Sequence, residues 1–200
     1  MKPSVEYEVD FGDGKKKRRI GPDSIDLVLT NPPFGKSVKT EGILLDYHFG
    51  HEVKVFKSKG RPPEKRPKNS QDSEVLFIEH YLRVLKPGGK LLIVLPDGVL
   101  SNATAKPVRD YMREHAIIKA VISLPSETFA STGTSIPTNV VYLQKKRPGD
   151  VQGDIFMARA DYVGRRANGD PLKENDLPFI LEKFREWQTG TLELPEEDNE

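Results

Sequence analysis

Short apolar runs alternate with helical patterns along the middle of this chain. Residues 25–30 (IDLVLT) and 90–95 (KLLIVL) are brief and mostly apolar, which is typical of strands buried on both faces of a parallel sheet. Between them, the apolar residues of 75–85 have helical spacing, and the Lys-Pro-Gly-Gly sequence at 86–89 ends that helix. The pattern predicts a strand–helix–strand unit with a right-handed crossover.

The pattern continues with more helices and strands. We expect a helix over 105–115, strands over 117–124 and 140–143, an edge strand near 154–158 and a terminal helix over 177–187. Because no helical pattern separates the third strand from the fourth, the fourth is predicted to return antiparallel at the sheet edge. The fold class is therefore α/β, with a mostly parallel sheet and one antiparallel return strand.

Polar segments flank and interrupt this core. Residues 1–24 have the alternation and turn signals of a weak hairpin and form an N-terminal extension. Within the main domain, 25–165, residues 36–70 are polar, basic and rich in Pro and Gly, which predicts a long loop. Residues 166–200 carry the terminal helix and an acidic tail.

Composition excludes several classes of protein. The chain has no Cys, so it has no disulfide scaffold, thiolate nucleophile or Cys-based zinc site. His48 and His51 are too few to predict a metal site. The formal net charge of +1 identifies no partner. There is no signal-peptide pattern and no apolar run of the ~20 residues that a membrane span needs, so a soluble cytoplasmic protein is expected.

One short motif carries specific chemistry. Asn31-Pro32-Pro33-Phe34 follows the first buried strand, and in open α/β sheets ligands bind at the carboxyl ends of strands. Proline restricts both its own backbone and that of the residue before it, so Asn31 and Pro32 are held extended. The alternative is that the prolines only end the strand and that Phe34 packs into the core.

Two acceptors side by side suit one chemical group, a planar NH₂. The Asn31 side-chain carbonyl and a neighbouring backbone carbonyl would bind both hydrogens of that group, which draws its nitrogen toward tetrahedral geometry and frees the lone pair for attack. The Phe34 ring offers a flat face, and stacking of a base on an aromatic ring contributes about 1–3 kcal/mol. Because such an amine is buried in duplex DNA, a target base would have to be flipped out.

Several segments together resemble a known family. The DLVLTNPPFG sequence at 26–35 looks like the catalytic motif of amino-group methyltransferases that use S-adenosylmethionine. Segments 77–82, 85–89, 94–100 and 134–139 resemble the modification subunit of type I restriction-modification systems, and they are equally similar to the related fused type II enzymes.

The resemblance, which covers about residues 20–165, implies a fold and a set of partners. The fold is a seven-stranded, Rossmann-like class I methyltransferase sheet, and 25–165 would be a partial catalytic domain that holds its carboxyl half. Asn31 and Pro32 would bind the adenine amino group, and Phe34 would stack on the base. The implied partners are S-adenosylmethionine, double-stranded DNA with a flipped adenine, a specificity subunit and a nuclease subunit.

One part of the family pattern is absent. The family carries a glycine-rich turn for the methionine part of the cofactor, and a ribose-binding carboxylate, upstream of its catalytic motif. Only 30 residues precede Asn31, and the Gly-Asp-Gly sequence at 12–14 does not follow a buried strand. Cofactor-binding residues therefore stay unassigned, and we expect the isolated fragment to be inactive.

Other candidate residues have two interpretations each. Seven basic residues of the 36–70 segment could contact DNA phosphates or could line a solvated loop: Lys54, Lys57, Lys59, Arg61, Lys65, Arg66 and Lys68. Asp97 and Asn139 could border a pocket or could simply form turns.

Adenine-N6 methylation of DNA is the leading hypothesis for function. The alternatives are methylation of a protein glutamine amide or of guanine N2 in ribosomal RNA, since these targets also present a planar NH₂. The segments at 95–98 and 135–139 and the basic insert favour DNA. A third alternative is an inert fragment that serves in assembly.

Overall fold

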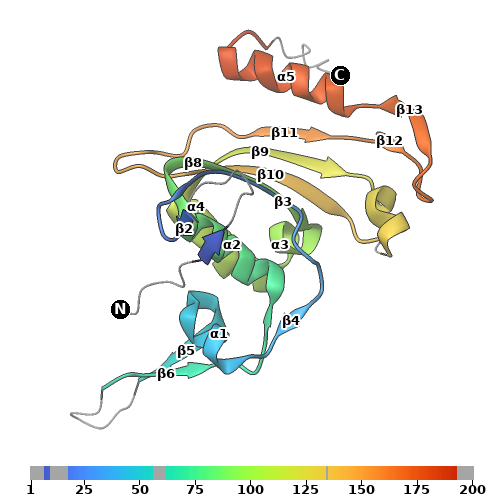
Figure 1. Cartoon of the computed structure of the whole chain (residues 1–200). Coiled ribbons are helices and arrows are strands. Elements are labelled where there is room, and N and C mark those ends of the chain that lie inside the picture. The colour runs from blue at the N-terminus through green and yellow to red at the C-terminus, as the bar shows by residue number, and fades with distance from the viewer. Residues whose placement is uncertain (1–6, 10–17, 56–61, 134, 193–200) are drawn as a thin grey trace.

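The computed structural model describes residues 7–9, 18–55, 62–133 and 135–192 of the 200 in the chain. Its centre is a five-stranded sheet in the order β11-β9-β10-β8-β3 (Figure 1). The strands are β3 (Ile25–Thr30), β8 (Leu85–Pro96), β9 (Ala116–Leu124), β10 (Thr138–Lys145) and β11 (Phe156–Arg159). The predicted α/β class is confirmed.

Helices cover both faces of this sheet. Helices α2 (Ser73–Val84), α3 (Asp97–Ser101) and α4 (Lys106–His115) lie on one face, and α5 (Leu177–Thr189) lies on the other (Figure 1). The main core joins β8 to α2 and α4 through buried apolar side chains: Leu91, Ile93, Leu95, Ile78, Leu82 and Met112. Under α5, a second core gathers Phe156, Ile180, Phe184 and Trp187.

The predicted strand–helix–strand unit is present. β3 and β8 pair in parallel, with Thr30 opposite Ile93, and α2 connects them. α2 ends at Val84, and β8 begins at once, so the Lys-Pro-Gly-Gly sequence belongs to a longer strand than we expected. Gly88 has a φ of +83°, a left-handed conformation that favours glycine.

The return strand is antiparallel, but its predicted position was wrong. β10 lies between β8 and β9 and pairs antiparallel with both, while β11 takes the edge and pairs in parallel with β9. The reason is burial, because Val141 and Leu143 of β10 are almost completely covered by the main core. A strand with such buried side chains lies inside the sheet, with a neighbouring strand on each side.

β3 is not buried on both faces, which corrects another expectation. Leu27 and Leu29 are 53% and 67% exposed. Their face of the sheet is the one that α5 covers, but α5 packs over β9, β10 and β11, and Tyr142 of β10 touches Phe184 of α5. Among the described residues, nothing covers the β3 part of this face.

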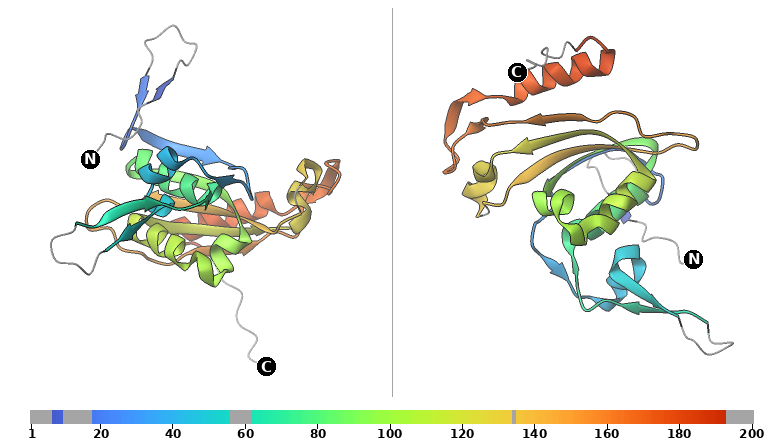
Figure 2. Two further views of the ribbon diagram at one scale, coloured as in Figure 1. Left: turned by 90° about the horizontal axis from the view of Figure 1, so that it is seen from below. Right: turned by 180° about the vertical axis from the view of Figure 1, so that it is seen from behind.

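The segment 36–70 contains short elements instead of one long loop. These are β4 (Ser37–Val38), α1 (Glu41–Asp46), the 3-10 turn η1 (His48–Gly50), β5 (His51–Lys54) and β6 (Glu64–Pro67), followed by β7 (Gln71–Asp72). β5 and β6 form a hairpin that projects from the body of the molecule (Figures 1 and 2). Buried Leu44 and Phe49 join this segment to the main core.

A buried carboxylate attaches the same segment to α2. Glu79 of α2 is 1% exposed and accepts hydrogen bonds from the backbone N–H groups of His48 (2.7 Å) and Phe49 (3.1 Å). Its charge is paired with Arg83, at 2.8 Å, and Arg83 also donates to the Asp46 carbonyl. The buried charge is therefore both paired and hydrogen-bonded, as burial demands.

The remaining elements are peripheral. β1 (Tyr7–Val9) and β2 (Arg18–Ile20) pair antiparallel, as do β12 (Val163–Arg165) and β13 (Pro171–Asn175), and the 3-10 turns η2 (Ala103–Ala105) and η3 (Ser126–Thr132) complete the list. The Gly-Asp-Gly sequence at 12–14 lies outside the described residues. In the described part of the chain, no helix is long and apolar enough to cross a membrane.

Candidate active site

The Asn-Pro-Pro-Phe motif leaves the carboxyl end of β3, where the sequence placed it. β3, β8, β9 and β11 run in parallel, so their carboxyl ends meet at one edge of the sheet, and β10 starts from the same edge beside Pro96. Along the motif, Asn31 is exposed, Pro32 is buried and Phe34 is half-buried. The Asn31 side chain is therefore open to a ligand from solvent.

Among the residues that the structure describes, the Pro33 carbonyl has a hydrogen-bond donor and the Pro32 carbonyl has none. The Ser73 hydroxyl donates a hydrogen bond to the Pro33 carbonyl at 3.1 Å. Asn31 makes no side-chain hydrogen bond with the residues that the structure describes. This arrangement leaves the Asn31 amide oxygen and the Pro32 carbonyl as the motif's acceptors, which is the pair that the sequence predicts for a planar NH₂ group.

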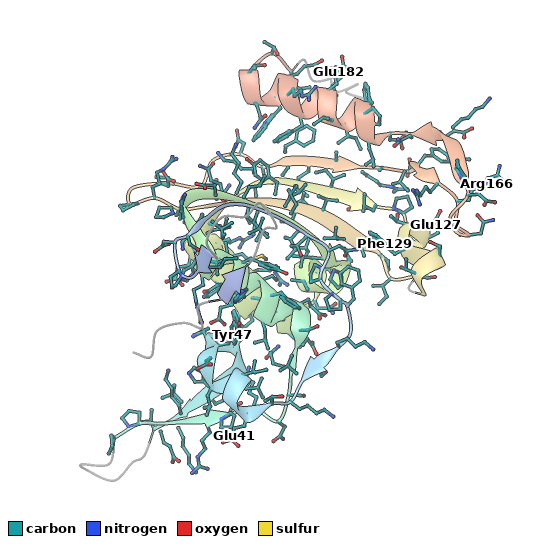
Figure 3. The ribbon with its side chains drawn as sticks, in the orientation of Figure 1. Glu41, Tyr47, Glu127, Phe129, Arg166 and Glu182 are labelled. Carbon is teal, nitrogen blue, oxygen red and sulfur yellow. The ribbon has the colours of Figure 1, made fainter. Side chains whose placement is uncertain are left out.

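A second aromatic ring, not anticipated from the sequence, borders the motif. Phe129 lies on η3, between β9 and β10 (Figure 3), and its ring meets that of Phe34 edge to face, with centroids 6.3 Å apart and planes at 73°. The available sequence signal was a single Phe within a turn rich in small residues. The two rings come from distant parts of the chain and meet at the carboxyl edge of the sheet.

Asn139 forms a polar bridge along the same edge. It is 3% exposed, its amide donates to Asp97 Oδ1 at 3.2 Å, and its carbonyl accepts from the Ser123 hydroxyl at 2.6 Å. Ser101 donates to the other Asp97 oxygen at 2.8 Å. Asn139 thus links the carboxyl ends of β8 and β9 through the start of β10. Asn139 lies within a strand, so the turn interpretation is wrong, and the residue is a buried connector at this edge of the sheet.

A cleft lies farther along this edge. Its volume is about 380 Å³, and its lining comes from β9, η3 and β11, with Ser123, Glu127 and Arg159 among the polar residues. Figure 3 shows Glu127 on the same turn as Phe129. The cleft therefore adjoins the aromatic side of the site, whereas its lining includes none of the four motif residues.

The predicted phosphate-binding residues are only partly described. Lys57, Lys59 and Arg61 lie outside the described residues. Lys54, Lys65 and Arg66 lie exposed on the β5–β6 hairpin, and Lys68 follows it directly. Arg66 pairs with Glu64 at 3.1 Å, and both side chains are about half exposed. The structure therefore brings Lys54, Lys65 and Arg66 together on the projecting β5–β6 hairpin, but it does not place them against Asn31.

No cofactor-binding residue can be assigned among the described residues. Two carboxylates at the edge of the sheet near the motif already have partners: Asp97 binds Asn139 and Ser101, and Glu74 accepts a hydrogen bond from the Ser73 hydroxyl at 3.5 Å. On its outer side, β3 pairs with no other described strand. The described part of the site therefore offers the two acceptors of the motif, and its cofactor-binding residues stay unassigned.

The strand order and the motif at the end of β3 define the class I methyltransferase fold. A Listeria monocytogenes protein assigned as a class I S-adenosylmethionine-dependent methyltransferase matches with a TM-score of 0.59 at 19% identity, over 82% of this chain and 43% of its own. The model of the N-6 DNA methylase family matches residues 6–199, and this chain belongs to that family.

Curated relatives agree with this family. The chain is 28% identical to the Escherichia coli type I restriction enzyme EcoEI methylase subunit, over 63% of this chain and 22% of the relative. It is 25% identical to the Haemophilus influenzae HindI methylase subunit, over 92% of this chain and 39% of the relative. A chain from a structure of a type I restriction-modification system matches with a TM-score of 0.59 at 22% identity, over 84% of this chain and 31% of its own.

Two consequences follow from these matches. The family match favours DNA methylation over the glutamine and ribosomal RNA alternatives. The chain also spans less than two-fifths of the length of both curated relatives, so their complete activities and assemblies do not transfer to it directly.

Proposed function

We propose that this chain supplies the amine-binding half of an adenine-N6 DNA methyltransferase, the modification subunit of a type I restriction-modification system. The observation that carries this proposal is the exposed Asn31 at the carboxyl end of β3, beside the Pro32 carbonyl and two facing aromatic rings. Membership of the N-6 DNA methylase family supports it.

The proposed chemistry belongs to the chain's own residues. The Asn31 amide oxygen and the Pro32 carbonyl accept the two N–H groups of the adenine amine, so that the nitrogen lone pair points away from the ring plane. The Phe34 ring stacks on the base, and the Phe129 ring, which meets Phe34 edge to face, borders the same space. S-adenosylmethionine, which the family uses, supplies the methyl group.

The proposed partners follow from the substrate and from the relatives. An adenine amine is inaccessible inside a duplex, so double-stranded DNA would bind with its target base flipped out. A specificity subunit would select the sequence, and a nuclease subunit would complete the system. Since the relatives are longer, a further segment, in the same chain or another, would supply the cofactor turn.

Phe34 variants test the proposal. The assay would use this chain assembled with a segment that carries the glycine-rich turn. Phe34→Tyr should keep substantial activity because any aromatic ring stacks on a base, whereas Phe34→Ala should lose about 10- to 100-fold, the equivalent of about 1–3 kcal/mol. Activity would be measured as radioactive methyl transfer to DNA, with N6-methyladenine identified by mass spectrometry.

Phe179→Ala is the matched control, since Phe179 is 61% exposed on α5, outside the site. Equal activity of Phe34→Ala and the unchanged chain would show that the Phe34 ring only fills space. Methylated glutamine or guanine, in place of N6-methyladenine, would contradict the proposed substrate.

We also propose that the β5–β6 hairpin contacts DNA phosphates. Lys54 and Lys65 are both exposed on its two strands. The double variant Lys54→Ala/Lys65→Ala should weaken binding to DNA of any sequence and lower the slope of log K against log salt by about 0.9 for each lost contact. The measurement is fluorescence anisotropy across a salt series. Lys173→Ala, on β13, is the control. An unchanged salt slope in the Lys54→Ala/Lys65→Ala variant would show that the hairpin does not contact DNA.

A further inference from the structure

The loop that carries Asn31 is fixed at its far end by the first turn of α2. Ser73, the first residue of α2, is 5% exposed. Its hydroxyl donates to the Pro33 carbonyl at 3.1 Å, and its backbone N–H donates to the Lys36 carbonyl at 2.8 Å. One buried residue thus binds the loop on both sides of Phe34.

Glu74 adds a third contact from the same turn. In this residue, which is 8% exposed, the backbone N–H groups of Gly35 and of Glu74 itself stabilise the charged carboxylate. Burial raises the pKa of this carboxyl, and the nearby Asp72 charge adds to the rise. Gly35 has a φ of +64°, so the contact lies at the point where the loop reverses.

The backbone just beyond these contacts is also fixed. β4 pairs with β7, with Ser37 opposite Asp72 and Val38 opposite Gln71. At its other end the loop leaves β3 at Thr30, whose hydroxyl lies 3.1 Å from that of Tyr81 of α2. The motif is therefore held by contacts at both of its ends, and α2 contributes to each of them.

We propose that Ser73 and Glu74 are positioning residues that hold the loop so that the Pro32 carbonyl and the Asn31 amide oxygen face the same amine. This inference rests on the proposed function, because it assigns a purpose to the loop's geometry. Ser73 occupies the Pro33 carbonyl, which prevents that carbonyl from competing as an acceptor. Glu74 fixes the turn that directs Phe34 toward Phe129.

A purely structural role makes a different prediction. An acidic residue in the first turn of a helix stabilises the helix through its dipole, and that effect depends on charge. A positioning role depends instead on an acceptor oxygen for the Gly35 N–H. Glu74→Gln removes the charge and keeps an acceptor, whereas Glu74→Ala removes both, so the two variants separate the roles.

The first readout needs no enzyme activity. Amide hydrogen exchange would be measured by NMR on the full 200-residue chain. In Glu74→Ala, exchange at Gly35 should quicken by about tenfold or more, since the Gly35 N–H loses the carboxylate beside it, while amides in the last turns of α2 stay within about twofold. Glu74→Gln should behave like the unchanged chain. Glu114→Ala, an exposed glutamate of α4, is the matched control.

The second readout is methyl transfer by the assembled enzyme. Glu74→Ala and Ser73→Ala should each lower kcat by about tenfold with KM for DNA unchanged, and Glu74→Gln and Ser73→Thr should restore most of the loss. Unchanged Gly35 exchange in Glu74→Ala would overturn the inference, as would equal loss of kcat in Glu74→Gln. Failure of the proposed function would be visible separately, as an Asn31→Ala variant that remains active while the exchange result still stands.

Discussion

Replacing Asn31 by Ala is expected to lower methyl transfer by on the order of 10³-fold, with DNA affinity within about twofold of the unchanged enzyme. The amide oxygen accepts an N–H whose nitrogen becomes positive as it bonds to carbon, so the interaction strengthens in the transition state. Such interactions change kcat and leave binding almost untouched. Because Asn31 is exposed and lies just beyond the end of β3, the variant should fold normally.

The measurement is single-turnover methyl transfer at saturating DNA, with affinity determined separately by anisotropy. Asn168→Ala, in the exposed turn between β12 and β13, is the control for loss of a surface amide. If Asn31→Ala lost DNA affinity but kept normal turnover at saturation, Asn31 would be a DNA contact and not a group that binds the amine.

Replacing Glu79 by Ala is expected to cost about 3–5 kcal/mol of the free energy of unfolding. The change leaves Arg83 without its partner and removes the acceptor for the backbone N–H groups of His48 and Phe49. The loss is costly because the Phe49 N–H stays buried without its acceptor and the partly buried Arg83 loses its counter-charge. Urea unfolding followed by circular dichroism would measure the loss.

Asp110→Ala provides the contrast, since the Lys106–Asp110 pair has the same i,i+4 spacing but both side chains are at least half exposed. It should move the urea midpoint far less than Glu79→Ala does. If the two variants shifted the midpoint equally, the bonds of Glu79 to η1 would contribute little. The segment from α1 to β6 would then be attached mainly by apolar contacts such as those of Leu44 and Phe49.

Most of the elements could be predicted because they depend on local pattern. α2 and α4 follow the 3.6-residue spacing of their apolar positions, and β8 and β9 each contain a mostly apolar run. The position of β10 could not be predicted, because strand order depends on contacts between residues far apart in the chain. The short elements of 36–70 escaped notice for another reason: few apolar residues, Leu44 and Phe49 among them, attach that segment to the core.

The same distinction applies to the site. Asn31 was found because the prolines and the preceding strand act locally, and both lie in one short stretch of sequence. Phe129 was not predicted and Asn139 was left with two interpretations, since each reaches the site only after β9 and β10 have formed. Glu74 and Glu79 read as ordinary polar residues of a helix, and only the three-dimensional structure shows that both are buried.

The insertion of β10 between β8 and β9 also sets the order in which this sheet can form during synthesis. β8 and β9 are neighbours in sequence, yet each hydrogen-bonds to β10, which leaves the ribosome after both. Until residue 145 has emerged, β8 and β9 of the nascent chain cannot pair with β10. During this time both apolar strands are exposed and prone to aggregation. Ribosome-stalled chains that end before Thr138 should therefore engage chaperones more strongly than chains that end after β10.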